Sequence, residues 1–206
     1  MAKKPASGTI KLPEPDRLGE VPFEEALARR RSVRSYSRTP LTLAGISQLL
    51  WAAQGITSKE GDRTAPSAGA LYPLELYVVA GNVSDLEPGV YKYRPKKHDL
   101  VRTMDKDLRS ALAAVALDQS CIKNGSVVIV IAAIYERVTG KYGGRGVMYT
   151  HIEVGLAGQN IHLQAESLGL GTVMVGAFYE EKVAKLLNMP EKEIAVALMP
   201  VGRKKK

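Results

Sequence analysis

The 206-residue sequence is poor in the residues from which common metal and redox centres are built. Its single cysteine, Cys121, excludes a disulfide within the chain and a metal site made of several cysteines. Only three histidines are present. His151 and His162 share a predicted helix but are about 16 Å apart along its axis, so they cannot bind one ion. The sequence therefore predicts no metal site.

Long apolar runs are also missing. The longest, over 127–135, has the length of a strand and falls well short of the roughly 18 residues that a membrane span needs. The N-terminus is basic, but no apolar segment of a secretory signal follows it. Together with the lone cysteine, these features predict a cytoplasmic protein from a reducing compartment, with no membrane partner.

Three well-known catalytic and nucleotide-binding motifs do not occur. No G-x-S-x-G is found, which excludes the nucleophile elbow of α/β-hydrolases. The phosphate-binding loop G-x-x-x-x-G-K-[ST] is missing, and no G-x-G-x-x-G follows a predicted strand. A dinucleotide held in the Rossmann manner is therefore not expected, and a nicotinamide cofactor would visit this protein only as a substrate.

The net charge of +8 comes from 29 Lys and Arg against 21 Asp and Glu. Five of the surplus charges lie in the tails, at Lys3, Lys4 and 204–206. Only two Phe and one Trp are present beside nine Tyr, and the surplus charge lies in the tails, so a nucleic-acid partner is not favoured. The internal cluster 29–34 suits a small anion such as a cofactor phosphate, or else a solvated helix end.

Hydrophobic periodicity predicts an α+β sandwich with an antiparallel component, because strands and helices do not alternate strictly. Residues 1–20 are expected to form an extended N-terminal arm, and 21–206 a single domain. No element is predicted over the polar, Gly-rich segment 136–147. Four or five strands are expected, over 74–80, 89–93, 126–135, 172–175 and 194–201. Helices are expected over 22–31, 43–54, 108–117, 149–168 and 180–187.

The predicted helix 149–168 is apolar on more than one side and is therefore expected to be central. Gly155, Ala157 and Gly158 give it a smooth side that another element can approach closely. Two interpretations remain open: this helix packs against a second copy of the chain, or it is buried inside one subunit.

Four segments combine cations, small side chains and bare peptide amides. Arginine forks bind phosphate in a bidentate manner, and small side chains let the backbone approach a flat ring. A protein with these segments and no other catalytic motif is expected to position a cofactor. The segments are 30–34, 65–70, 175–178 and 200–203.

The motif Arg30-Arg31-Ser32-Val33-Arg34 resembles the opening of the nitroreductase-like FMN flavoprotein superfamily. Three further motifs follow in the matching order, over 66–75, 86–91 and 169–172. They resemble the SagB-type branch, the thiazole- and oxazole-forming dehydrogenases. The similarity extends over about residues 10–203.

The resemblance implies an FMN enzyme with ping-pong hydride transfer through flavin N5. The implied fold is a nitroreductase-like sandwich, a mostly antiparallel central sheet flanked by helices, with the long helix at a homodimer interface. Two FMN sites would lie at that interface, and the loop 66–70 would come from the partner copy. The residues assigned to the flavin are Arg30, Arg31, Ser32, Arg34, Pro66, Ser67, Ala68, Ala70, Gln119, Gly176, Ala177, Arg203 and Lys205.

Some residues depart from the family pattern. Azoline-oxidising relatives use a Lys-Tyr pair after a Leu; Lys141 and Tyr142 match the pair, but Gly140 replaces the Leu. Ala70 and Tyr72 stand where other nitroreductases carry Asn and Gln. The implied function is either a SagB-type dehydrogenase of a small molecule or peptide, or an NAD(P)H-dependent nitro or quinone reductase. The alternative is a flavin-binding or regulatory protein without turnover.

Overall fold

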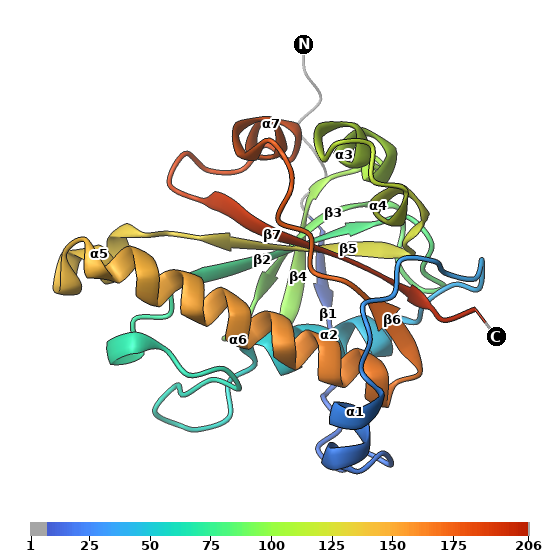
Figure 1. The fold of residues 1–206 in the computed structure, drawn as a ribbon, viewed down its shortest axis with the longest axis horizontal. Helices are drawn as coiled ribbons and strands as arrows, with labels where there is room; N and C mark the ends of the chain where they lie inside the picture. Colours follow the sequence, from blue (N-terminus) through green and yellow to red (C-terminus); the bar gives the residue numbers. More distant parts are fainter. Residues whose placement is uncertain (1–7, 206) are drawn as a thin grey trace.

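The computed structural model of the protein describes residues 8–205. Its centre is a sheet of seven strands in the order β1-β4-β3-β2-β5-β7-β6, and every neighbouring pair is antiparallel (Figure 1). The predicted α+β class with a central antiparallel sheet is confirmed. The strands are β1 Thr9–Lys11, β2 Leu74–Ala80, β3 Gly89–Arg94, β4 Asp99–Met104, β5 Val127–Ala133, β6 Leu170–Thr172 and β7 Ile194–Arg203.

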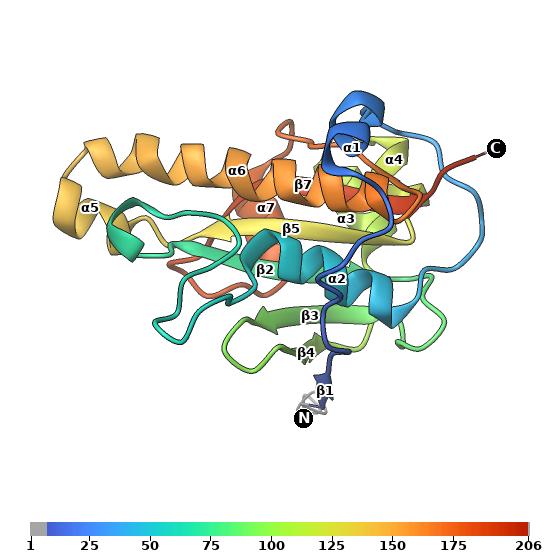
Figure 2. The same ribbon diagram turned by 90° about the horizontal axis from the view of Figure 1, so that it is seen from below.

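Helices cover both faces of the sheet. Figure 1 shows α3, α4 and α7 on one face, and α1, α2 and the long α6 on the other. Figure 2 shows α5 at the N-terminal end of α6 and α1 near its C-terminal end. The helices are α1 Phe23–Arg29, α2 Leu43–Gln54, α3 Arg109–Val115, α4 Ser120–Asn124, α5 Glu136–Tyr142, α6 Arg145–Ser167 and α7 Glu180–Leu186.

Strand β5 is the centre of the core, and each of its residues is buried. Its alternate side chains enter two different clusters: Ile129 and Ile131 pack with α2 and α6, whereas Val128 and Val130 pack with α3, α4 and α7. Because both faces of the strand are covered, its sequence is continuously apolar and shows no alternation.

The sequence predicts four or five strands, and the structure has seven. The two missed strands, β1 and β4, lie at one edge of the sheet and are rich in polar residues, so their hydrophobic signal is weak. Strand β1 belongs to the segment predicted as an arm. The first seven residues of that arm, with Lys3 and Lys4, and Lys206 at the other end, lie outside the described residues.

Two predicted boundaries are wrong. The Gly-rich segment 136–147 contains α5, and α6 begins at Arg145 instead of residue 149. A glycine is required there because a Cβ at Gly146 would lie 2.7 Å from the backbone nitrogen of Thr139 in α5. The strand predicted over 172–175 is β6, two residues earlier, and Val175 forms only an isolated bridge with Leu198.

No helix within residues 8–205 is both long enough and apolar enough to cross a membrane. Nor does the range contain three or more His, Cys, Asp or Glu side chains placed to hold a metal ion together.

The missed strand β4 is tied to β3 by a two-point ion pair, which provides a test. Arg94 Nε and Nη2 donate to the two carboxylate oxygens of Asp99 at 2.7 and 2.6 Å, and this pairing lowers the pKa of Asp99 below its ordinary 3.8. The stabilisation is present above pH 3.8 and is lost as pH falls through the lowered value. Asp99→Asn should therefore lower the urea midpoint at pH 7, with a difference that shrinks below pH 3.8. The exposed Asp105→Asn is the control, and an equal effect from both variants would contradict the prediction.

Candidate functional site

The arginine-rich segment after α1 runs along the free edge of β6. Ser32 forms a parallel bridge with Thr172, and the Val33 amide donates to the Thr172 carbonyl at 2.9 Å. Tyr36 is buried below the segment, and its hydroxyl donates to the carbonyl of Val33 at 2.8 Å. Gly171 permits this approach, since a Cβ there would lie 2.6 Å from a methyl group of Val33. The backbone around Ser32 is therefore fixed, while its neighbouring arginines extend outward.

The cations of this edge are available to a ligand. Among the described residues, Arg30, Arg34, Arg203 and Lys205 form no ion pair with a carboxylate. Arg31 differs, because its Nη1 donates to the carbonyls of Ala28 and Arg30 and so closes the end of α1. Arg203 is near because its strand β7 pairs with β6. The arrangement suits a phosphate, with Arg31 in a supporting role.

Bare backbone amides follow Met174, whose side chain packs on α6 at Gly158, about one turn before His162. After Val175 pairs with Leu198, the chain leaves the sheet, and Gly176 and Ala177 are exposed. Within residues 8–205 their N–H groups have no hydrogen-bond partner. Gln119 donates from Nε2 to the Ala177 carbonyl at 2.9 Å, which holds this turn against the link between α3 and α4. The two amides can therefore donate to an acceptor on a bound ring.

The small-residue loop predicted to face the cofactor forms a second cluster. The Ala68 amide donates to Oε1 of Glu153, a buried residue of α6, at 2.9 Å. The hydroxyl of Ser67 accepts from the Tyr72 amide at 2.8 Å. Pro66 and Ala70 are exposed. The loop therefore presents small side chains to solvent while its backbone is held from below.

The predicted catalytic pair lies directly on this loop. A Cβ at Gly69 would be 2.7 Å from the hydroxyl of Tyr142 and 3.0 Å from Nζ of Lys141. The Lys141 ammonium also lies 5.4 Å from the centre of the Tyr142 ring. The structure thus brings together segments that are about 70 residues apart in the sequence, the loop and the end of α5.

The two clusters lie on opposite sides of α6. Glu153, which holds Ala68, is nine residues before His162, or about 180° around a helix. His162 faces the arginine segment: burial and, to a smaller extent, the charge of Arg30 lower its pKa. Figures 1 and 2 both show the loop before β2 near the α5 end of α6, and α1 near the other end. The two clusters of one chain are therefore separated both around α6 and along it.

An exposed apolar ridge separates the clusters. Its side chains lie on the solvent side of α6: Ile152 is 51% exposed, and Met148 and Leu156 are exposed as well. Gly155 lies between them, with open space where a Cβ would stand. Apolar side chains gathered on one helix face are typical of a protein interface.

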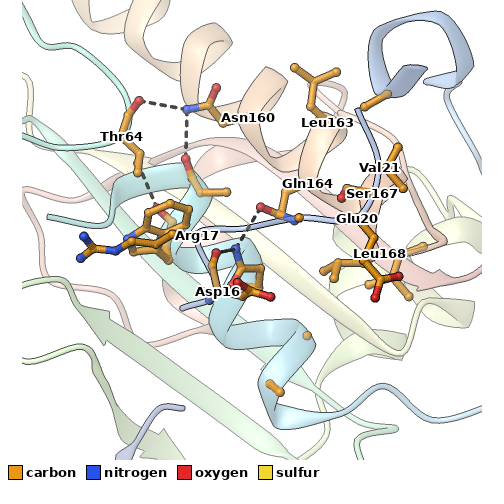
Figure 3. Close-up of a pocket in the computed structure, with 18 of the residues that line it drawn as sticks. Asp16, Arg17, Glu20, Val21, Thr64, Asn160, Leu163, Gln164, Ser167 and Leu168 are labelled. Carbon is orange, nitrogen blue, oxygen red and sulfur yellow. Dashed lines mark hydrogen bonds between the residues drawn. The ribbon is translucent and has the colours of Figure 1, made fainter. Parts of the chain in front are cut away.

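A cavity of about 690 Å³ lies elsewhere, between the segment 14–21, α2 and α6 (Figure 3). Some of its polar groups are paired: Gln48 exchanges hydrogen bonds with the backbone of Asp16, and Asn160 donates to the Thr64 carbonyl at 3.3 Å. Of the residues assigned to the flavin, only Arg203 lines this cavity. It is therefore not the candidate site.

Sequence reasoning missed Glu153. The available signal was its spacing, because it precedes Ala157 and Ile161 at intervals of four on the buried side of α6. A carboxylate at such a position needs a partner, since burying a charge without one is costly. Which partner it has could not be read from the sequence, because Ala68 lies 85 residues away.

Comparisons with known proteins agree with this architecture. The Nitroreductase family model matches residues 27–203. The nitroreductase homologue MJ1384 of Methanocaldococcus jannaschii is 49% identical over 196 residues, which cover 95% of this chain and 98% of that protein. A crystal structure of a nitroreductase homologue from Ralstonia eutropha has a TM-score of 0.83 at 29% identity, covering all of this chain and 96% of the other.

A more distant relative is the microcin B17-processing protein McbC of Escherichia coli. It is 28% identical over 138 residues, which are 65% of this chain and 51% of McbC. The family match covers most of the chain, including both clusters described above. The chain therefore belongs to the nitroreductase family.

Proposed function

We propose that this protein is an FMN-dependent oxidoreductase that acts as a homodimer, with each flavin site built from both copies. The observation that carries the proposal is the separation of the two clusters by α6. The Arg30–Arg34 segment and the Gly176–Ala177 amides lie on one side of this helix, and the loop 66–70 lies on the other. A second copy docked on the exposed ridge brings its loop to the first copy's arginines and amides.

The residues present fit FMN. Arg30, Arg34, Arg203 and Lys205 would hold the phosphate, aided by the exposed Ser32 hydroxyl, since these cations have no carboxylate partner among the described residues. The chemistry supplied by bound FMN is two-electron transfer between a donor and an acceptor. The Gly176 and Ala177 amides would donate to the polar edge of the ring at N5 and O4. Positive charge and N–H donors placed there favour the reduced state.

Lys141 and Tyr142 are the proposed proton-handling groups. They lie over Gly69, in the cluster that would face the partner's flavin. In its deprotonated form, either side chain could take the proton that a substrate loses while the substrate's hydride passes to the bound flavin. Lys141 is exposed and Tyr142 is half-buried, and their contact with the loop supports this role.

Within the family, two substrate classes compete. The Lys141–Tyr142 pair and the similarity to McbC support a SagB-type dehydrogenase acting on an azoline ring in a peptide or small molecule. The similarity to MJ1384 supports an NAD(P)H-dependent nitro or quinone reductase. Turnover of NADPH with menadione would select the second class, and turnover of a thiazoline peptide alone would select the first. A bound flavin that neither NAD(P)H nor a dithiol reduces would instead indicate a binding protein.

The phosphate assignment predicts a loss of flavin affinity. A hydrogen bond to a charged group contributes roughly 1.5–3 kcal/mol, so Arg30→Ala and Arg34→Ala should each weaken FMN binding about ten- to hundredfold in a fluorescence titration. Arg29→Ala is the matched control, because Arg29 is one position away and pairs with Glu25 of its own helix. Full flavin retention in both test variants would show that the assignment is wrong.

The shared site predicts that dimer formation and flavin binding are lost together. Ile152→Asp places a charge on the apolar ridge, where a single copy tolerates it because the side chain is half exposed. This variant should sediment as a monomer with an unchanged far-UV spectrum and weak FMN binding. Ala114→Asp, on the exposed side of α3 across the sheet, should remain dimeric. A monomeric wild type that binds FMN tightly would refute the shared site.

A further inference from the structure

We infer that Glu153 is a positioning residue of the flavin site: its buried carboxylate holds the loop Ser67–Tyr72 in the shape that faces the second copy. The inference rests on the proposed function, because it concerns the loop that would contact the partner's flavin. Glu153 does not itself reach the exposed surface of the loop. It acts through the backbone of Ala68.

The position of Glu153 is unusual for a carboxylate. The residue is 4% exposed and lies in the middle of α6. Burial raises its pKa, while the hydrogen bonds from Ala68 and Ser67 and the charge of Arg63 lower it by less. Within the described chain, Ala68 is the residue whose amide Glu153 accepts at hydrogen-bond distance. The structural consequence of this burial is that the carboxylate holds the start of the loop through the Ala68 amide.

The loop needs such an anchor because its backbone is strained. Gly69, Ala70 and Tyr72 all have positive φ angles, of 62°, 54° and 46°. Two of these residues carry side chains, for which the left-handed region is unfavourable. Strain of this kind persists only where the surroundings determine the conformation. It is concentrated in the loop that the proposal places against the partner's flavin.

Other contacts fix the far end of the loop. The Tyr72 amide donates to Ser67, its carbonyl accepts from Nη1 of Arg137 at 2.9 Å, and its ring lies 4.5 Å below the Arg63 guanidinium. At the start of the loop, the Ser67 carbonyl accepts from the Ala70 amide at 3.0 Å, while the Ala68 amide has Glu153 as its acceptor. Removal of the carboxylate therefore leaves the Ala68 amide without its partner.

Movement of the loop would also displace the candidate catalytic pair, Lys141 and Tyr142. Gly69 follows Ala68 directly and lies against Tyr142 and Lys141. An added side chain would not fit between them, so the loop and the pair are in close contact. Glu153 therefore fixes the position of the backbone on which Lys141 and Tyr142 rest.

The test compares three variants of the full-length protein. Glu153→Ala removes the acceptor, whereas Glu153→Gln keeps an oxygen that can accept from Ala68. Thr150→Val is the matched control: Thr150 is equally buried, lies one turn earlier on the same helix, and bonds only to the Gly146 carbonyl of α6. The first readout is amide hydrogen exchange of Ala68 in flavin-free protein. The second is the dissociation constant of FMN.

Glu153→Ala should raise the exchange rate of the Ala68 amide at least tenfold and weaken FMN binding about tenfold. Glu153→Gln should keep the Ala68 exchange rate and the FMN affinity close to those of the wild type. Thr150→Val should change neither quantity, although it lowers the unfolding midpoint. Unchanged Ala68 exchange in Glu153→Ala would overturn the inference. So would raised exchange with full FMN affinity, because the loop would then have no role in the site.

The two proposals fail in different ways. A wild type that binds no FMN overturns the proposed function, and with it the role of Glu153 toward flavin, whatever the exchange rates are. If Glu153→Ala does not fold, Glu153→Gln and Ser67→Ala provide the comparison. Ser67→Ala removes the acceptor of the Tyr72 amide and the hydroxyl contact with Glu153, but it keeps the Ala68 amide on the carboxylate, so amide exchange should rise more at Tyr72 than at Ala68. An equal or larger rise at Ala68 would contradict an anchor of Ala68 at Glu153.

Discussion

Helix α6 is the constraint on which the rest of the structure depends. It is 23 residues long, or about 34 Å, and it packs along the sheet between α1, α2 and β6. Each side of the helix carries a different part of the candidate site, and the solvent side between them is apolar. A rigid helix cannot bring its own two sides together. This geometry is the basis of our proposal that the site is shared by two copies.

The two halves of the candidate site differ in what they would offer a ligand: one carries charge and hydrogen-bond donors, and the other carries small side chains. The half at β6 presents arginines and amides that have no partner among the described residues, and its backbone is fixed to the sheet edge through Thr172. This arrangement supplies charge and donors without a rearrangement on binding. The half at Ala68 supplies shape: small side chains on a strained backbone, anchored from inside by Glu153. In both halves, hydrogen bonds within the chain hold the backbone in place.

Sequence patterns predicted the parts of the fold whose signal is local. Helix α2 was placed at its observed limits because Thr42 caps it and Gly55 ends it. Strand β5 was recognised by its continuous apolar residues. The polar edge strands β1 and β4 and the short helices α4 and α5 were missed. Strand β1 depends on its pairing with β4, far away in the sequence, whereas α4 and α5 are only five and seven residues long and show no extended hydrophobic period.

The same distinction applies to the site. Arginine forks and bare amides are visible in the sequence as short motifs, so their chemistry could be anticipated. The anchoring of Ala68 by Glu153 and the contact of Gly69 with Tyr142 depend on contacts between distant segments, which no local pattern encodes. Nor does the sequence show which segments of one chain lie on the same side of α6. Only the three-dimensional structure shows this.

A mixed dimer tests the shared site most directly. One copy carries Arg30→Ala and Arg34→Ala; the other carries Gly69→Val, which is strained at the φ of 62° and crowds Tyr142 and Lys141. The two copies are purified together through separate tags. Each variant alone should bind FMN poorly. If the site is shared, the mixed dimer has one intact site and should bind one FMN per dimer with wild-type affinity. If all contacts came from a single chain, both sites would be damaged, and a mixed dimer that binds no FMN would contradict the account.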